Sequence, residues 1–163
     1  MTNYLSFIRR KVKGAAHYSA GELAMVPVAL LLLGLARLAI LLVPFKHYSR
    51  LLGAKQSGAP LPAALENAQS AKARSIGRTV RATAAITPWN AVCLPQAIAA
   101  AALLRMARVP YAVYFGLAKD GYDPRKDPMR AHAWLQAGER IVTGGPLDPE
   151  YHVVACFMLV RKA

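Results

Sequence analysis

Acidic residues are scarce in this chain, which has 21 lysines and arginines against 8 aspartates and glutamates and a net charge of +13. The imbalance lies in residues 1–110, with 14 basic and 2 acidic residues, whereas residues 111–163 hold 7 and 6. A basic surface attracts anionic partners such as membrane headgroups, nucleic acid or an acidic peptide. A solvated basic surface without a partner explains the net charge equally well. The chain lacks a zinc finger, a clear helix-turn-helix and a basic–aromatic sheet motif, so we expect no nucleic-acid partner.

Cysteine is also rare, and motifs for metals and phosphates are missing. The two cysteines, Cys93 and Cys156, form no disulfide framework and lack the spacing of a metal site. The acids in residues 119–128 do not have the spacing of a metal-binding loop, and no glycine-rich phosphate loop occurs. We therefore expect reduced thiols, a cytoplasmic protein, no metal and no evident cofactor.

One stretch is strongly apolar. Residues 23–45 carry a single charge, Arg37, and approach the length of about 20 residues that a membrane-spanning helix needs. Arg37 would cost about 2.5–3.5 kcal/mol near the centre of a bilayer. We expect Pro27 and Pro44 to bracket a helix that is buried or lies at an interface, in preference to a spanning one. Residues 4–14 form a basic amphipathic pattern of the kind that lies on a membrane or packs on the domain, so a membrane surface is a candidate partner and peripheral membrane association stays open.

The remaining pattern predicts an α+β fold. Helices are expected at 44–53 and 62–86, separated by a turn-rich linker. After residue 110 the period changes from helix to strand, which predicts a strand near 111–118, a hairpin over 130–143 and a buried strand over 151–160. We expect a basic, hydrophobic N-terminal helical region, 1–60, and a core, 61–163, in which a helix packs on a small, mostly antiparallel sheet. Residues 119–128 are expected to form an exposed loop that serves as a lid or contacts a peptide.

Cys93 is expected at the start of that packed helix. Thr87-Pro88 breaks the preceding structure, Pro95 suits a first helical turn, and an alanine-rich run follows. A helix N-terminus favours the nucleophilic thiolate. Together with His132 on a probable strand, Cys93 makes the minimal set for a cysteine-nucleophile hydrolase. From residue types alone, a buried structural cysteine and a satisfied histidine are the favoured explanation.

Several segments occur in a characteristic order: Trp89, Cys93-Leu94-Pro95-Gln96-Ala97, Tyr111 to Lys119, His132-Ala133-Trp134, Ile141 to Gly145 and Tyr151 to Ala155. Three more precede them: Leu30 to Arg37, Pro44-Phe45 and Leu51-Leu52-Gly53. Over most of its length the chain thus resembles the lasso-peptide leader peptidases, which are transglutaminase-like maturation proteins of bacterial ribosomal-peptide clusters. This resemblance reverses the preference for a structural cysteine.

The resemblance implies a cysteine protease with a papain- or transglutaminase-like core. Such a protein removes the leader of a lasso precursor peptide, so that a separate asparagine-synthetase-like cyclase can close the ring. The leader would be recognised by a winged-helix protein, and we expect a separate one because no segment of suitable length is left over in this chain. ATP dependence is implied by the family alone, since the sequence shows no site for it.

Carried over to this chain, the resemblance implies that Cys93 is the nucleophile and that His132 is the general base and later the acid. Trp89 and Trp134 are candidates for lining the substrate cleft. The family pattern has an aspartate after the histidine that orients the imidazole, but this chain reads Thr143-Gly144-Gly145 there.

Three groups are candidates for that orienting role. Asp148 is the nearest downstream acid, although an ordinary loop residue before Pro149 explains it more simply; Thr143 and a backbone carbonyl are the others. The missing carboxylate also favours an alternative function, a non-catalytic, membrane-associated scaffold that binds the precursor or the cyclase. A thiol transferase or an amidase with a non-peptide substrate also stays open, because one fold hosts several acyl-transfer chemistries.

Overall fold

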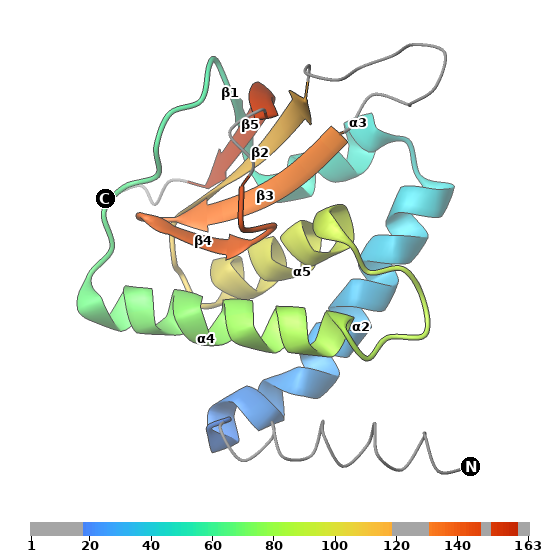
Figure 1. The fold of residues 1–163 in the computed structure, drawn as a ribbon, viewed down its shortest axis with the longest axis vertical. Helices are drawn as coiled ribbons and strands as arrows, with labels where there is room; N and C mark the ends of the chain where they lie inside the picture. The colour runs from blue at the N-terminus through green and yellow to red at the C-terminus, as the bar shows by residue number, and fades with distance from the viewer. Residues whose placement is uncertain (1–17, 119–130, 148–150, 160–163) are drawn as a thin grey trace.

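A computed structural model describes residues 18–118, 131–147 and 151–159. The helices are α2 (Ala20–Leu42), α3 (Phe45–Tyr48), the 3₁₀ helix η1 (Ser49–Leu52), α4 (Asn67–Ala84) and α5 (Cys93–Met106). The strands are β1 (Ala54–Gln56), β2 (Tyr111–Ala118), β3 (Ala131–Ala137), β4 (Arg140–Thr143) and β5 (Tyr151–Leu159). Figure 1 shows α4 and α5 against one face of the sheet, and α2 packs on both of these helices. The α+β prediction is confirmed.

The strands form one sheet in the order β1-β5-β2-β3-β4, and every pairing is antiparallel. The linker prediction missed β1, because three residues without apolar alternation carry no strand signal. Gly53 makes this pairing possible: its φ is 129°, and a Cβ there would lie 2.5 Å from the carbonyl oxygen of Met158. The edge strand is thus specified by a close backbone approach and not by its own side chains.

Both faces of the sheet are covered. Tyr111 and Val113 of β2 belong to the main core, which the helices share, whereas Tyr114 lies in a second cluster on the opposite face. Tyr114 stacks on Trp134 with ring centroids 5.4 Å apart, and its hydroxyl donates to the carbonyl of Pro60 at 2.7 Å. The linker between β1 and α4 therefore contacts the face away from the helices. This coverage explains why β2 is buried along most of its length.

Helix α2 differs from its prediction at its start. It begins at Ala20 because Ser19 and Glu22 form a capping box, and Pro27 lies inside the helix instead of at its boundary. Pro27 is exposed and is the eighth residue of the helix. Helix α4 was predicted to begin at residue 62. It begins at Asn67 instead, because Glu66 and Gln69 form a second capping box.

Only a narrow stripe of α2 is buried, formed by Glu22, Ala29, Leu33 and Ala36. The helix is long and apolar enough to cross a membrane, as judged by length and composition. The sequence predicted a helix that is either buried or at an interface. Because most of the large apolar side chains of α2 are exposed, α2 is not a buried core helix, and the interface alternative is the one left.

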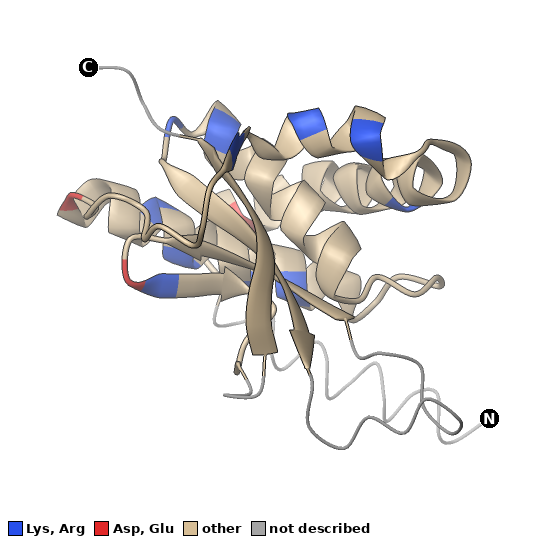
Figure 2. Cartoon of the chain, turned by 90° about the horizontal axis from the view of Figure 1, so that it is seen from above, with Lys and Arg blue, Asp and Glu red and all other residues tan. Residues whose placement is uncertain are grey.

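Basic residues outnumber acidic residues in the described chain, as the blue and red segments of the ribbon in Figure 2 show. One of those few acids, Glu22, is buried and lies 3.4 Å from Nε of Arg78. The predicted amphipathic segment 4–14, the predicted loop 119–128 and Asp148 lie outside the described residues.

Candidate active site

Cys93 is the first residue of α5 and is partly exposed. The helix starts here because Val92 is extended and Pro95 needs no hydrogen-bond partner in the first turn. The side chain of Gln96 donates to the carbonyl of Ala91 at 2.7 Å and fixes the approach to the helix. No acid or side-chain cap occupies this end of α5, so the N–H groups and partial positive charge of the first turn can stabilise a developing oxyanion.

Cys156 differs from Cys93 in its burial. It is fully buried in β5, and burial raises the pKa of its thiol. A buried neutral thiol is a poor nucleophile. Of the two cysteines, Cys93 is the one placed for chemistry.

His132 is the second residue of β3, and its imidazole makes one short hydrogen bond. Nε2 lies 2.6 Å from the carbonyl oxygen of Gly144. A carbonyl oxygen only accepts hydrogen bonds, so Nε2 carries the proton and donates it. In the neutral ring, Nδ1 then holds the lone pair that a general base needs. An acceptor that holds the proton of one ring nitrogen and frees the other to act as base does what the third member of a catalytic triad does.

Gly144 can aim its carbonyl at His132 because it is a glycine. Its φ is 82°, and a Cβ at this position would lie 2.6 Å from the carbonyl oxygen of Ala133 and 2.7 Å from Cβ of Trp134. Of the two candidates for orienting His132 that lie within the described residues, the backbone carbonyl is the one in contact, and Asp148 lies outside them. The hydroxyl of Thr143 is fully buried and has no hydrogen-bond partner among the described residues.

Aromatic rings surround the imidazole. His132 stacks on Trp134 with centroids 6.1 Å apart, and its centroid lies 5.1 Å from that of Tyr151. Gly116 faces the same ring system, and a Cβ there would come within 2.7 Å of the Trp134 ring. Tyr151 was not predicted as a site residue, because only the pairing of β5 with β2 brings it there.

Topology brings Cys93 and His132 to one end of the domain. A short turn joins α5 to β2, and β3 runs antiparallel to β2, so α5 and β3 run in the same direction and pack together. Cys93 lies about 20 Å along α5 from that turn. His132 pairs with Gly116, about 17 Å along β2 from the same turn. The start of α5 and the start of β3 accordingly lie on the same side of Figure 1.

The two side chains are not hydrogen-bonded to each other in the described structure. Leu135 and Ala137 of β3 belong to the helix-side core, whereas His132 stacks on Trp134, which lies in the cluster on the opposite face. Catalytic contacts often tighten only when substrate binds. The structure therefore places the nucleophile and base candidates at one end of the domain, with the imidazole on the face of β3 away from the helices and without direct contact to Cys93.

The two tryptophans are packed side chains. Trp134 is 5% exposed. The ring of Trp89 would lie 3.6 Å from a Cβ at Gly34 of α2, and its indole N–H is buried without a partner in the described part of the chain. Trp89 thus anchors the segment before Cys93 on α2, and its role toward a substrate stays a prediction.

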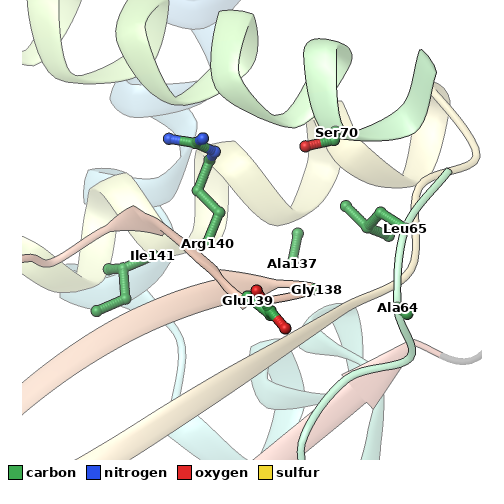
Figure 3. A pocket seen from close by; sticks show the side chains of 8 residues that line it. All are labelled: Ala64, Leu65, Ser70, Ala137, Gly138, Glu139, Arg140 and Ile141. Atoms are coloured by element: carbon green, nitrogen blue, oxygen red, sulfur yellow. The ribbon is translucent and has the colours of Figure 1, made fainter. Parts of the chain in front are cut away.

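A surface pocket lies elsewhere. Figure 3 shows it between the linker, the start of α4 and the β3–β4 turn, lined by Ala64, Leu65, Ser70, Ala137, Gly138, Glu139, Arg140 and Ile141. That turn is about 17 Å along β3 from His132, so the pocket does not belong to the candidate active site. The described residues also contain no cluster of three or more His, Cys, Asp or Glu side chains suited to a metal ion.

Comparison with known proteins gave one family. The family model described as "Transglutaminase-like superfamily" matches residues 35–156, which include α5, Cys93, His132 and Gly144. No curated protein and no solved structure matches the chain. Members of this superfamily are generally cysteine proteases or transferases. Because the match spans most of the chain and all of the candidate site, the protein belongs to the transglutaminase-like superfamily.

Proposed function

We propose that this protein is a cysteine peptidase that removes the leader from a lasso precursor peptide, so that a separate cyclase can close the ring. The observation that carries the peptidase proposal is the hydrogen bond from Nε2 of His132 to Gly144 at the end of the domain where Cys93 begins α5. The specific substrate rests on the sequence resemblance. The proposed partners are the leader peptide, a separate winged-helix recognition protein and an asparagine-synthetase-like cyclase, all in the cytoplasm.

The proposed reaction is acyl transfer to the thiol followed by hydrolysis. Nδ1 of His132 takes the proton of the Cys93 thiol, and the thiolate attacks the scissile carbonyl. N–H groups at the start of α5 stabilise the oxyanion, and the imidazolium then protonates the leaving amine as the C–N bond breaks. Water deprotonated by His132 attacks the thioester, which releases the leader acid and restores the thiol.

Gly144 gives this dyad an uncharged third member. Its carbonyl dipole orients the ring and accepts the proton-bearing Nε2, but it carries no full negative charge to stabilise the imidazolium. The Gly144 carbonyl thus replaces the missing aspartate in orienting the imidazole, but it stabilises the imidazolium charge only in part. This arrangement supports a peptidase that works without the family carboxylate.

The test is co-expression with the precursor peptide and the recognition protein, read by mass spectrometry. Cys93→Ala and His132→Ala are each expected to abolish the leader-free peptide, while Cys156→Ala, which changes the other cysteine, retains it. Circular dichroism of each variant shows whether the fold is intact. Leader removal that persists in folded Cys93→Ala overturns the peptidase assignment.

The second candidate is a non-catalytic scaffold for the precursor or the cyclase. It is favoured by the absence of a hydrogen bond between Cys93 and His132 in the described structure and by the missing carboxylate. A scaffold predicts that maturation requires the protein but not its thiol. Complementation of a strain lacking the protein with Cys93→Ala separates the two functions, because only a scaffold restores the mature peptide.

A further inference from the structure

Helix α2 presents one face of large apolar side chains to solvent. We call this the outer face; it consists of Val28, Leu31, Leu35, Leu38 and Leu42, which are 42%, 61%, 51%, 52% and 76% exposed. Their spacing of three and four residues places them on one side of the helix. The buried stripe of Ala29, Leu33 and Ala36 lies on the opposite side, against α4 and α5. Soluble monomers rarely expose a contiguous apolar surface of this kind without a partner.

The charges within α2 after Glu22 and in the segment that follows the helix along the chain all have one sign. No acidic residue occurs from 23 to 65, whereas four basic residues do: Arg37, Lys46, Arg50 and Lys55. Lys46 and Arg50 are exposed and follow directly on the C-terminal end of α2. The nearest acid before them, Glu22, is buried and lies beside Arg78. The segment thus combines apolar side chains with uncompensated positive charge, which complements the surface of an anionic bilayer.

The packing of α2 determines how it can meet a bilayer. Ala29 and Leu33 are fully buried in the same core as residues of α4 and α5. A spanning α2 would have to leave this core or carry the cationic α4 into hydrocarbon, and charged side chains there are costly. A helix that keeps its inner stripe on the domain can still insert its outer face to the depth of the headgroups.

We propose that the outer face of α2, together with Lys46 and Arg50, docks the protein onto an anionic membrane surface, with α2 parallel to the bilayer plane. This surface lies outside the Cys93–His132 site, so the inference is independent of the proposed peptidase activity. If both hold, leader removal takes place at the membrane surface.

Vesicle co-sedimentation of the full chain tests the inference. The probes are vesicles of phosphatidylcholine alone and of phosphatidylcholine mixed with phosphatidylglycerol. We expect binding to the anionic vesicles that weakens with salt, and a loss of about tenfold or more in the double variant Leu35→Glu/Leu38→Glu. The matched control is Leu61→Glu, because Leu61 is 77% exposed on the linker and not on α2. Lys46→Glu/Arg50→Glu is expected to weaken binding and reduce its salt dependence.

The alternatives give distinct results. If wild type does not sediment with anionic vesicles, or if Leu61→Glu weakens binding as much as the α2 variant, the proposal is wrong. If wild type is a dimer that Leu35→Glu/Leu38→Glu converts to a monomer without altering vesicle binding, the outer face docks a second copy instead. Retention in membranes after alkaline carbonate washing indicates a spanning helix and contradicts in-plane docking. Thermal unfolding of each variant confirms that the fold is retained.

Discussion

At the scale of single residues, Gly144 performs a task that usually belongs to a side chain. A carbonyl can orient an imidazole as a carboxylate does, but the backbone must be held at the correct angle. The positive φ of Gly144, and the lack of room for any Cβ there, impose that angle. The sequence predicted that the carboxylate is missing and left the backbone among the candidates. Which glycine supplies the carbonyl depends on how the chain turns after β4, and no local pattern in Thr143-Gly144-Gly145 encodes that turn.

Replacing Gly144 by alanine tests this positioning role. We expect Gly144→Ala to lower the free energy of unfolding by more than about 1 kcal/mol, because alanine is strained at positive φ. We also expect the hydrogen bond to be lost, so that neutral His132 no longer holds its proton on Nε2 alone. The ¹⁵N shifts of the imidazole nitrogens report the tautomer, and His132→Gln identifies its signals among the four histidines.

The control is Gly145→Ala, since a Cβ there would meet no backbone atom, only Cγ2 of Ile141 at 3.1 Å, and Gly145 has no positive φ. That variant should keep the wild-type imidazole shifts. A wild-type His132 with its neutral proton on Nδ1 contradicts the positioning role, even if Gly144→Ala fails to fold.

At the scale of elements, helix ends and close approaches decide the boundaries that composition left open. A capping box starts α2 at Ala20, before the predicted start at Pro27, and another starts α4 at Asn67, after the predicted start at residue 62. The strands of the hairpin and of β2 were predictable because their apolar alternation is local. The pairing of β1 with β5 was not, because it depends on the approach of Gly53 to Met158. Most elements were thus predictable from the sequence, whereas their ends and edge pairing required tertiary contacts.

The capping box of α2 makes a pH-dependent contribution to stability. The hydrogen bond from the Ser19 N–H to Glu22, together with Arg78, holds the pKa of this carboxyl below its usual value despite burial. A folded-state pKa that is lowered stabilises the fold above the unfolded pKa of about 4.3, and this contribution is lost as pH falls through the folded value.

We therefore expect Glu22→Gln to reduce the free energy of unfolding by about 0.5–1 kcal/mol near neutral pH, since a glutamine keeps the cap but not the charge. The difference from wild type should shrink in acid. Urea unfolding at both pH values measures it, and a difference that is independent of pH shows that Glu22 contributes through packing alone.

Gly77 of α4 offers a test of helix packing on the sheet. Glycine to alanine in a helix interior normally stabilises by up to about 1 kcal/mol. A Cβ at Gly77, however, would lie 2.7 Å from the carbonyl oxygen of Val142 in β4. We expect Gly77→Ala to destabilise the fold, whereas Gly34→Ala in α2, whose nearest neighbour would be the Trp89 ring at 3.6 Å, should be neutral or stabilising. Urea unfolding of both variants gives the signs, and a stabilising Gly77→Ala contradicts the packing of α4 on β4.

At the scale of the whole molecule, the candidate site depends on how three consecutive elements, α5, β2 and β3, are arranged in space. The order α5, β2, β3, with β2 and β3 antiparallel, brings Cys93 and His132 to the same end of the domain. The face of β3 on which His132 lies, and its neighbours Tyr151 and Gly144, follow from strand pairing. Sequence reasoning had no access to that pairing, so it identified the chemical groups but not their contacts.

The same contacts determine whether residues 61–163 form an independent core. Leu33 of α2 and Leu52 of η1 are fully buried in the main cluster, β1 completes the sheet beside β5, and the family match begins at residue 35. A chain of residues 61–163 would expose this core and leave β5 as an unpaired edge. We expect it to lose cooperative urea unfolding and near-ultraviolet dichroism, whereas a chain that begins at residue 18 retains both. A folded and active 61–163 would show instead that the helical region is a detachable module, and membrane docking through α2 would then be separable from leader cleavage. Loss of folding means that the helix proposed to meet the bilayer also supports Cys93, because α2 packs on the helix that Cys93 begins.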